Sequence, residues 1–192
     1  MLQLKRSLLV FLWLSLICGL IYPLTITMIA QAVFPEQSNG SIIKHGKQIM
    51  GSQLIGQLLT SPEYFHGRPS ATDPQYDASN SGGSNLAPSG AKLIAQTQTR
   101  VRQVREENSL SQKSPVPADL VLTSASGLDP HISPLSASVQ IRRIAGERRI
   151  SEVELEKIIH QNTEQPLLGI WGKERVNVLL LNLALDGIKT KR

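Results

Sequence analysis

The stretch from Ser7 to Phe34 constrains the chain most, because no charged side chain lies between Arg6 and Glu36. A helix of ~20 apolar residues is long enough to span the ~30 Å hydrocarbon core of a bilayer. A soluble helix of this length would need a polar stripe, which this run lacks. We therefore predict a transmembrane helix over residues 7–34.

The placement of basic residues predicts how this helix is oriented. Lys5 and Arg6 precede the span, and the next basic residue is Lys44. By the positive-inside rule, residues 1–6 stay in the cytoplasm and residues 35–192 form an extracytoplasmic domain.

A cleaved signal peptide is the alternative interpretation of the same segment. The basic N-terminus and the small-x-small pattern at residues 30–32 both fit a secretory leader. A leader has an apolar core of only ~7–15 residues, about half of what is present here. Length favours a retained anchor, and a secreted binding domain remains the alternative.

Composition limits what the domain after the helix can be and can bind. Aromatic residues make up only 4% of the chain, so Leu, Ile and Val must build the core, and the single cysteine, Cys18, lies within the span. The net charge of +5 suggests a basic surface. No basic patch with interleaved aromatic residues is present, which argues against nucleic acid and favours acidic partner surfaces or membrane lipid.

Residue patterns after the span predict an α+β fold, with a single domain of short strands and three or so helices. The predicted helices cover residues 89–112, 133–149 and 151–165. The predicted strands are a hairpin at 41–51 and runs at 53–59, 167–171 and 176–183. Between them, residues 70–88 form a long polar loop, and loops of this length are usually functional or disordered.

Two of the predicted helices carry start signals. Ser133 precedes a proline, as at many N-caps, and Ser151 is followed three residues later by Glu154 in a capping box. On the first of these helices we expect Leu135, Val139 and Ile144 on the apolar side.

Ser126, Asp129 and His131 are the components of a nucleophilic triad, and they lie in one short segment. A membrane-anchored periplasmic hydrolase that uses them is one hypothesis. Residues so close in sequence rarely converge as a triad, and no Gly-x-Ser-x-Gly elbow is present. Gly127 and Pro130 favour a turn or a partner contact instead.

Two other patterns give weak signals for ligands. The glycine pair within residues 81–85 could present backbone N–H groups to an anion, but a simple turn is the more common meaning of such a pair. The histidines have no partner at metal-ligand spacing, so we predict no metal site. They are His45, His66, His131 and His160.

Six segments together resemble the C subunit of the Kdp-type potassium-transporting P-type ATPase. They are residues 51–57, 64–71, 81–86, 115–121, 124–133 and 176–182. Each segment alone is unspecific, but all six in this order after one N-terminal span are highly specific for the family.

The resemblance implies a place in a bacterial inner-membrane complex. In that complex a channel-like A subunit selects potassium, a B subunit hydrolyses ATP, and a small F peptide accompanies them. The C subunit would be an accessory, single-pass protein with a periplasmic domain. It is not an enzyme by itself, and the family is described as a chaperone that raises the ATP affinity of the B subunit.

The resemblance also implies site residues. A nucleotide role attaches to Gln140, although the predicted topology places this residue away from cytoplasmic ATP, which could act through the catalytic subunit alone. We therefore expect a structural role, in which the domain caps the potassium entrance of the A subunit. The family segments supply further candidates for partner contacts or structural loops, namely Arg68, Ser84, Asn85, Ser126, Asp129 and His131.

Overall fold

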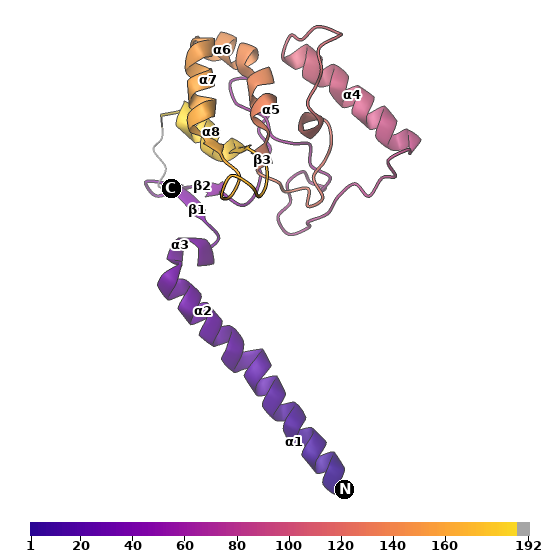
Figure 1. Ribbon diagram of the computed structural model, residues 1–192, viewed down its shortest axis with the longest axis vertical. Helices are drawn as coiled ribbons and strands as arrows, with labels where there is room; N and C mark the ends of the chain where they lie inside the picture. The colour runs from indigo at the N-terminus through magenta and orange to yellow at the C-terminus, as the bar shows by residue number, and fades with distance from the viewer. Residues whose placement is uncertain (188–192) are drawn as a thin grey trace. The chain divides into compact units, whose positions relative to one another are not determined.

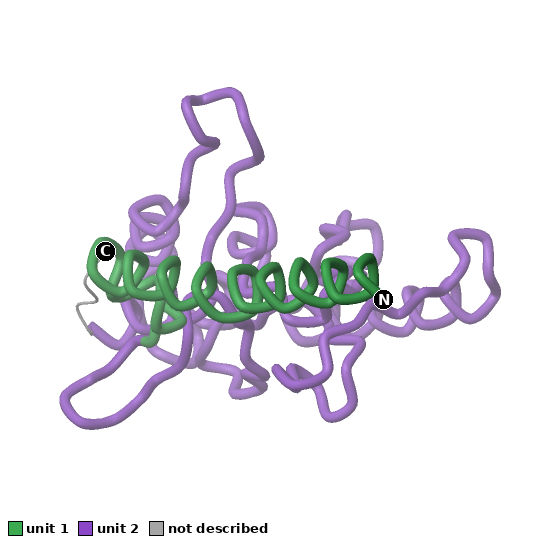
Figure 2. Tube along the Cα trace, turned by 90° about the horizontal axis from the view of Figure 1, so that it is seen from below, with its two compact units in different colours: residues 1–42 green, residues 43–192 purple. Residues whose placement is uncertain are grey.

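The computed structural model of the chain describes residues 1–187. The chain divides into two compact units, the first over Met1–Ile42 and the second beginning at Ile43 (Figure 2). Each unit is described here by itself.

The first unit is dominated by one helix, Leu2–Val33, which is long and apolar enough to cross a membrane, with a mean hydropathy of 2.2. It consists of α1 (Leu2–Leu16), a π-helical turn (Ile17–Ile21) and α2 (Tyr22–Val33). Pro23 has no backbone N–H to donate, and the π-helical turn carries the helix past it. The predicted long apolar helix is confirmed.

Polar groups of this helix find their partners within it. The hydroxyls of Thr25 and Thr27 donate to the carbonyls of Ile21 and Pro23, each at 2.8 Å. Such internal bonds leave these hydroxyls satisfied in a bilayer, where no water is available. A short helix, α3 (Pro35–Ser38), follows.

The second unit begins with the predicted hairpin, formed by β1 (Ile42–His45) and β2 (Gln48–Ser52). Ile43 of the hairpin is buried against Leu179 and Leu183. The hairpin is thereby attached to the last helix of the unit.

Four helices and a small sheet enclose the main core (Figure 1). The helices are α5 (Pro134–Val139), α6 (Ile141–Arg148), α7 (Glu152–Gln161) and α8 (Val178–Leu185). The sheet is antiparallel with the strand order β3-β5-β4, from β3 (His131–Ile132), β4 (Thr163–Glu164) and β5 (Arg175–Asn177). Helix α7 packs against α5, α6 and α8, so it holds the helical layer together.

The core residues come mainly from these elements, with one exception. Ile144, Leu155, Val176 and Leu181 are completely buried and belong to α6, α7, β5 and α8. Phe65 is equally buried but belongs to an irregular segment far from the others in sequence. The chain must therefore hold this segment in place without a strand or a helix.

The predicted caps are confirmed. The Ser133 hydroxyl accepts a hydrogen bond from the Ser136 N–H, and the Ser151 hydroxyl accepts one from the Glu154 N–H, each at 3.2 Å. These side chains satisfy N–H groups that the first turn of a helix leaves without partners.

The helix predicted at 89–112 is confirmed as α4 (Ala91–Glu107), but it is shorter, and none of its residues is buried. It lies apart from α5–α8 (Figure 1). Leu93, Thr97, Val101 and Val104 follow the predicted spacing and are half-buried, so this stripe is partly covered without joining the fully buried core.

Residues 53–59 do not form the predicted strand. The Gly56 N–H donates to the Leu128 carbonyl at 2.8 Å, and the Gln57 side chain donates to the Met50 carbonyl at 3.0 Å. Hydrogen bonds to a distant loop and from its own side chain hold this segment. The strand predicted from its apolar residues is therefore wrong.

The helix predicted over 133–149 is two helices, α5 and α6, which meet at Gln140. Leu135 is 64% exposed, so its predicted place on the apolar side is wrong, whereas Ile144 is fully buried as predicted. Helical spacing nevertheless continues across the junction, and Leu135 lies nine residues, or about 180° around a helix, from Ile144. The residues buried on the continuous face are Ser136, Ala137, Gln140, Ile141 and Ile144.

The strand predicted over 176–183 is mostly helix. Only Val176 and Asn177 belong to β5, and α8 starts at Val178 because the Asn177 side chain accepts from the Leu180 N–H at 3.2 Å. Spacing cannot separate a strand from a helix that is apolar on nearly all sides. The predicted strand at 167–171 is reduced to a single bridge between its ends. The described part of the second unit therefore contains more helices than the three predicted.

The burial of Ile144 and the exposure of Leu135 can be tested by replacing each residue with alanine. Ile144→Ala should lower the free energy of unfolding by roughly 2–5 kcal/mol, because it leaves a cavity in the core. Leu135→Ala should change it by less than about 0.5 kcal/mol, because the side chain is exposed. Urea unfolding of the detergent-solubilised chain, followed by circular dichroism, measures both. Equal losses would contradict the assignment of Ile144 to the core and of Leu135 to the surface.

Candidate functional site

Two side-chain amides hold the backbone of Phe65 and His66. Asn182 of α8 accepts from the Phe65 N–H at 2.8 Å and donates to the Phe65 carbonyl at 2.9 Å. Gln140 does the same for His66, at 2.8 and 3.1 Å. We call these four bonds the amide clamp. It gives two consecutive residues the pairing that a neighbouring strand would otherwise provide.

All the hydrogen-bonding groups of Gln140 are used inside the protein. Besides the two bonds to His66, its nitrogen donates to the Ser136 carbonyl at 3.1 Å and its oxygen accepts from Arg143 at 2.8 Å. The side chain is only 1% exposed. A ligand that contacts this amide would first have to displace one of these bonds.

Two arginines of α6 donate hydrogen bonds to the backbone of the same segment. Arg143 donates to the carbonyls of Pro62 and Tyr64, and Arg148 donates to the Glu63 carbonyl at 2.8 Å. Three consecutive carbonyls, which no strand or helix pairs, are thus satisfied by charged donors. These arginines serve the fold and not only a solvated helix face.

Arg148 also joins the segment to the end of α8. Its guanidinium lies 2.7 Å from the Asp186 carboxylate and 4.6 Å from the centre of the Tyr64 ring. The Tyr64 hydroxyl donates to the same carboxylate at 3.0 Å. Burial, followed by the hydrogen bond to Asp186, raises the pKa of Tyr64 above its ordinary value.

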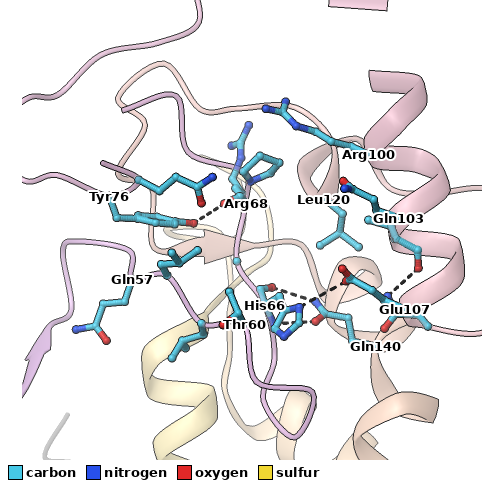
Figure 3. A pocket seen from close by; sticks show the side chains of 17 residues that line it. Gln57, Thr60, His66, Arg68, Tyr76, Arg100, Gln103, Glu107, Leu120 and Gln140 are labelled. Carbon is cyan, nitrogen blue, oxygen red and sulfur yellow. Dashed lines mark hydrogen bonds and ion pairs between the residues drawn. The ribbon is translucent and has the colours of Figure 1, made fainter. Parts of the chain in front are cut away.

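A cavity of about 240 Å³ lies beside the amide clamp (Figure 3). The segment 57–60, residues 66–69, and one side of α4 line it, with Gln140 in its wall. The His66 Nε2–H donates to the Ser61 carbonyl at 3.0 Å, and the Nδ1 of the ring lies 3.7 Å from a Glu107 oxygen. Burial lowers the pKa of His66, so the ring is neutral at pH 7.

Arg68, just before the loop of residues 70–88, pairs with Asp129 in the loop of residues 122–131. Their side chains are 2.9 Å apart, and Arg68 also donates to the Thr123 carbonyl at 3.2 Å. Burial alone would raise the pKa of Asp129, but hydrogen bonds from His131 and Arg68 outweigh it and lower the pKa to about 2. The Asp129 carboxylate therefore stays charged over the whole physiological pH range.

Glycine allows the two loops to approach closely. Gly127 has a φ of +69°, and a Cβ atom there would lie 2.7 Å from the Gly82 carbonyl oxygen and 2.9 Å from Thr72. The hydroxyl of Ser70 donates to the Gly127 carbonyl at 2.7 Å. Residues 70–88 contain neither helix nor strand, as predicted, but they are bound to the second loop by such contacts.

The three triad candidates do not form a triad. Asp129 accepts from the His131 N–H at 3.0 Å and lies 3.5 Å from the His131 ring. The Ser126 hydroxyl instead accepts from the Leu128 N–H at 3.1 Å and shares a 3.3 Å hydrogen bond with Ser124. Over residues 1–187 no hydrogen bond connects Ser126 to His131. The segment has the hydrogen bonds of a turn.

The remaining candidates lie at the edge of the same loop contact. Ser84 and Asn85 are exposed, and Asn85 has a φ of +50°. The Gly82 N–H, which could have faced an anion, donates to the Ser126 carbonyl at 2.9 Å. Within the described residues, no three His, Cys, Asp or Glu side chains gather as metal ligands.

The structure thus brings Arg68, Asp129 and His131 together and keeps Gln140 in a separate cluster. Asn182, which completes that cluster, was not predicted as a site residue from the sequence. One signal for it was present: a single amide inside the apolar run of α8 must find partners if it is buried.

Comparisons with known proteins identify the family of the chain. Residues 4–187 match the model of the family described as "K+-transporting ATPase, c chain". A relative from Beijerinckia indica is 51% identical, over 90% of this chain and 87% of the relative. A relative from Koribacter versatilis is 46% identical, over 90% and 88%.

A third relative, from Rhodopseudomonas palustris BisB18, is 45% identical over 97% of this chain and 98% of its own length. All three are named "Potassium-transporting ATPase KdpC subunit". Matches at this identity over nearly the full length of both chains leave one conclusion. The chain belongs to the KdpC family, the c chains of K+-transporting ATPases.

Proposed function

We propose that this chain is an accessory, non-catalytic subunit of an ATP-driven potassium uptake complex. Its family and the apolar helix Leu2–Val33, which can anchor it as a single-pass protein, support this role. The partners are a channel-like A subunit, an ATP-hydrolysing B subunit and a small F peptide. Potassium is the transported ion of the complex and is no ligand of this chain.

The domain lies on the outer side of the inner membrane, and the N-terminus lies in the cytoplasm. Lys5 and Arg6 before the helix support this orientation. In this position the domain stabilises the assembly beside the potassium entrance of the A subunit.

The hydrogen bonds of the Gln140 side chain support the structural role in this proposal. Its amide is saturated by protein groups, and it holds the backbone of His66 on α5 and α6. A residue so engaged supports the shape of the domain and has no free group for ATP. The effect on ATP affinity described for the family would then reach the B subunit through the assembly, without nucleotide bound at Gln140.

Orientation can be tested by cysteine labelling in a Cys18→Ala background. A cysteine at the exposed Ser84 should react with a membrane-impermeant thiol reagent in intact spheroplasts. A cysteine at Gln3, before the span, is the control and should react only after lysis. The reverse pattern would place the domain in the cytoplasm and contradict the proposal.

The role of Gln140 can be tested against Asn182, which makes the same pair of bonds one residue away. Gln140→Leu and Asn182→Leu each leave a buried N–H and a buried carbonyl without partners, so each should cost roughly 2–4 kcal/mol of unfolding free energy. In purified complex, both should lose bound subunit to a similar extent.

ATP dependence of the potassium-stimulated ATPase separates the two roles. In the complex that remains, the KM for ATP should be the same for both variants. A KM that rises tenfold in Gln140→Leu alone would show a direct nucleotide contact. Gln98→Ala, on the exposed part of α4, is the control and should match the unchanged protein.

The hydrolase alternative can be tested at the loop contact. Ser126→Ala should leave subunit assembly intact, because its hydroxyl bonds only locally. Gly127→Val should weaken assembly, because its side chain would collide with Gly82 and Thr72. Co-purification of the subunits measures both. A hydrolytic turnover of the isolated chain that disappears in Ser126→Ala would favour the hydrolase.

A further inference from the structure

A short apolar loop between β4 and β5 lies outside the core. Leu167, Leu168, Ile170 and Trp171 are 69%, 77%, 76% and 63% exposed. These four side chains, together with Gly169, are the apolar loop. Single exposed apolar residues are ordinary, but several large ones side by side mark a surface that another molecule covers.

The apolar loop has a defined conformation. The N–H of Leu167 donates to the Trp171 carbonyl at 2.9 Å, and the Trp171 N–H donates back at 3.0 Å. Leu168 and Gly169 turn the chain with φ values of +54° and +71°. Backbone pairing across the loop presents its apolar side chains from a hydrogen-bonded turn, which lowers the entropy cost of ordering the backbone on binding.

Charged residues of both signs surround this apolar centre. Arg175 and Glu164 form an ion pair at 2.9 Å, and Lys173 and Glu174 are exposed beside them. An apolar centre that contains tryptophan, with a mixed polar rim, is typical of protein–protein interfaces. A loop that enters an anionic bilayer surface would instead be favoured by a rim that is mainly basic.

We propose that the apolar loop inserts into an apolar socket on another subunit of the potassium-transporting complex. This inference rests on the proposed function, because it requires an assembled complex. The apolar loop contains none of the site residues that were predicted from the sequence. Trp171 provides the largest side chain of the contact, and the charged rim borders it.

The test uses the accessibility of one cysteine at the tip. Leu168→Cys in a Cys18→Ala background is compared with Val153→Cys, which is 75% exposed on α7. The rate of labelling by a hydrophilic maleimide is measured for the isolated full-length chain in lipid nanodiscs, the isolated chain in detergent, and the purified complex in the same detergent.

We expect Leu168→Cys to react at least tenfold more slowly in the complex than in either sample of the isolated chain. Val153→Cys should react at similar rates throughout. Slow labelling of Leu168→Cys in nanodiscs without the other subunits would show that lipid covers the loop, and would overturn the proposal. Equal rates in all three samples would overturn it as well.

A second pair of variants tests the contact without a label. Trp171→Ala should reduce the co-purified subunits at least tenfold and leave unfolding of the isolated chain unchanged. Val153→Ala, equally exposed, should retain them. If the unchanged chain does not co-purify with other subunits, the proposed function itself fails. If it does and Trp171→Ala behaves like it, only the inference about the apolar loop fails.

Discussion

The fold of the second unit depends on the contacts that hold one irregular segment, which pairs with no strand, against the core. Phe65 is fully buried, yet the backbone beside it pairs with no strand. Buried N–H and carbonyl groups without partners would each cost roughly 1–3 kcal/mol. The amides of Gln140 and Asn182 remove this cost, and Arg143 and Arg148 bind the less buried carbonyls just before. Without them, the core would lose its central aromatic ring.

Features that depend on residues close in sequence could be predicted, whereas features that depend on distant residues could not. The caps at Ser133 and Ser151 depend on residues three positions away, so the sequence was enough. The buried face of 133–149 contains Ser136 and Gln140, so apolar residues alone do not mark it. Leu135 was misplaced because it lies nine residues, or about 180° around a helix, from the buried Ile144.

The candidate site divides in the same way. Glycine at position 127 and the nearby Asp129 indicated a turn, and the turn is present. The pairing of Asp129 with Arg68 joins residues 61 positions apart and had no local signal. Asn182 was missed for a similar reason, since α8 was interpreted as a strand with no special role for a single amide. Family resemblance located the right segments but could not supply their contacts.

The π-helical turn at Ile17–Ile21 also affects how neighbouring helices can contact the anchor. A π turn adds one residue to a turn, and one residue corresponds to about 100° around an α-helix. The side chains of α2 are therefore rotated relative to a continuation of α1. A straight transmembrane helix that follows one stripe of α1 meets a different stripe on α2. In the proposed role as a membrane anchor, the helix would thus present separate contact faces to neighbours on either side of the π-helical turn.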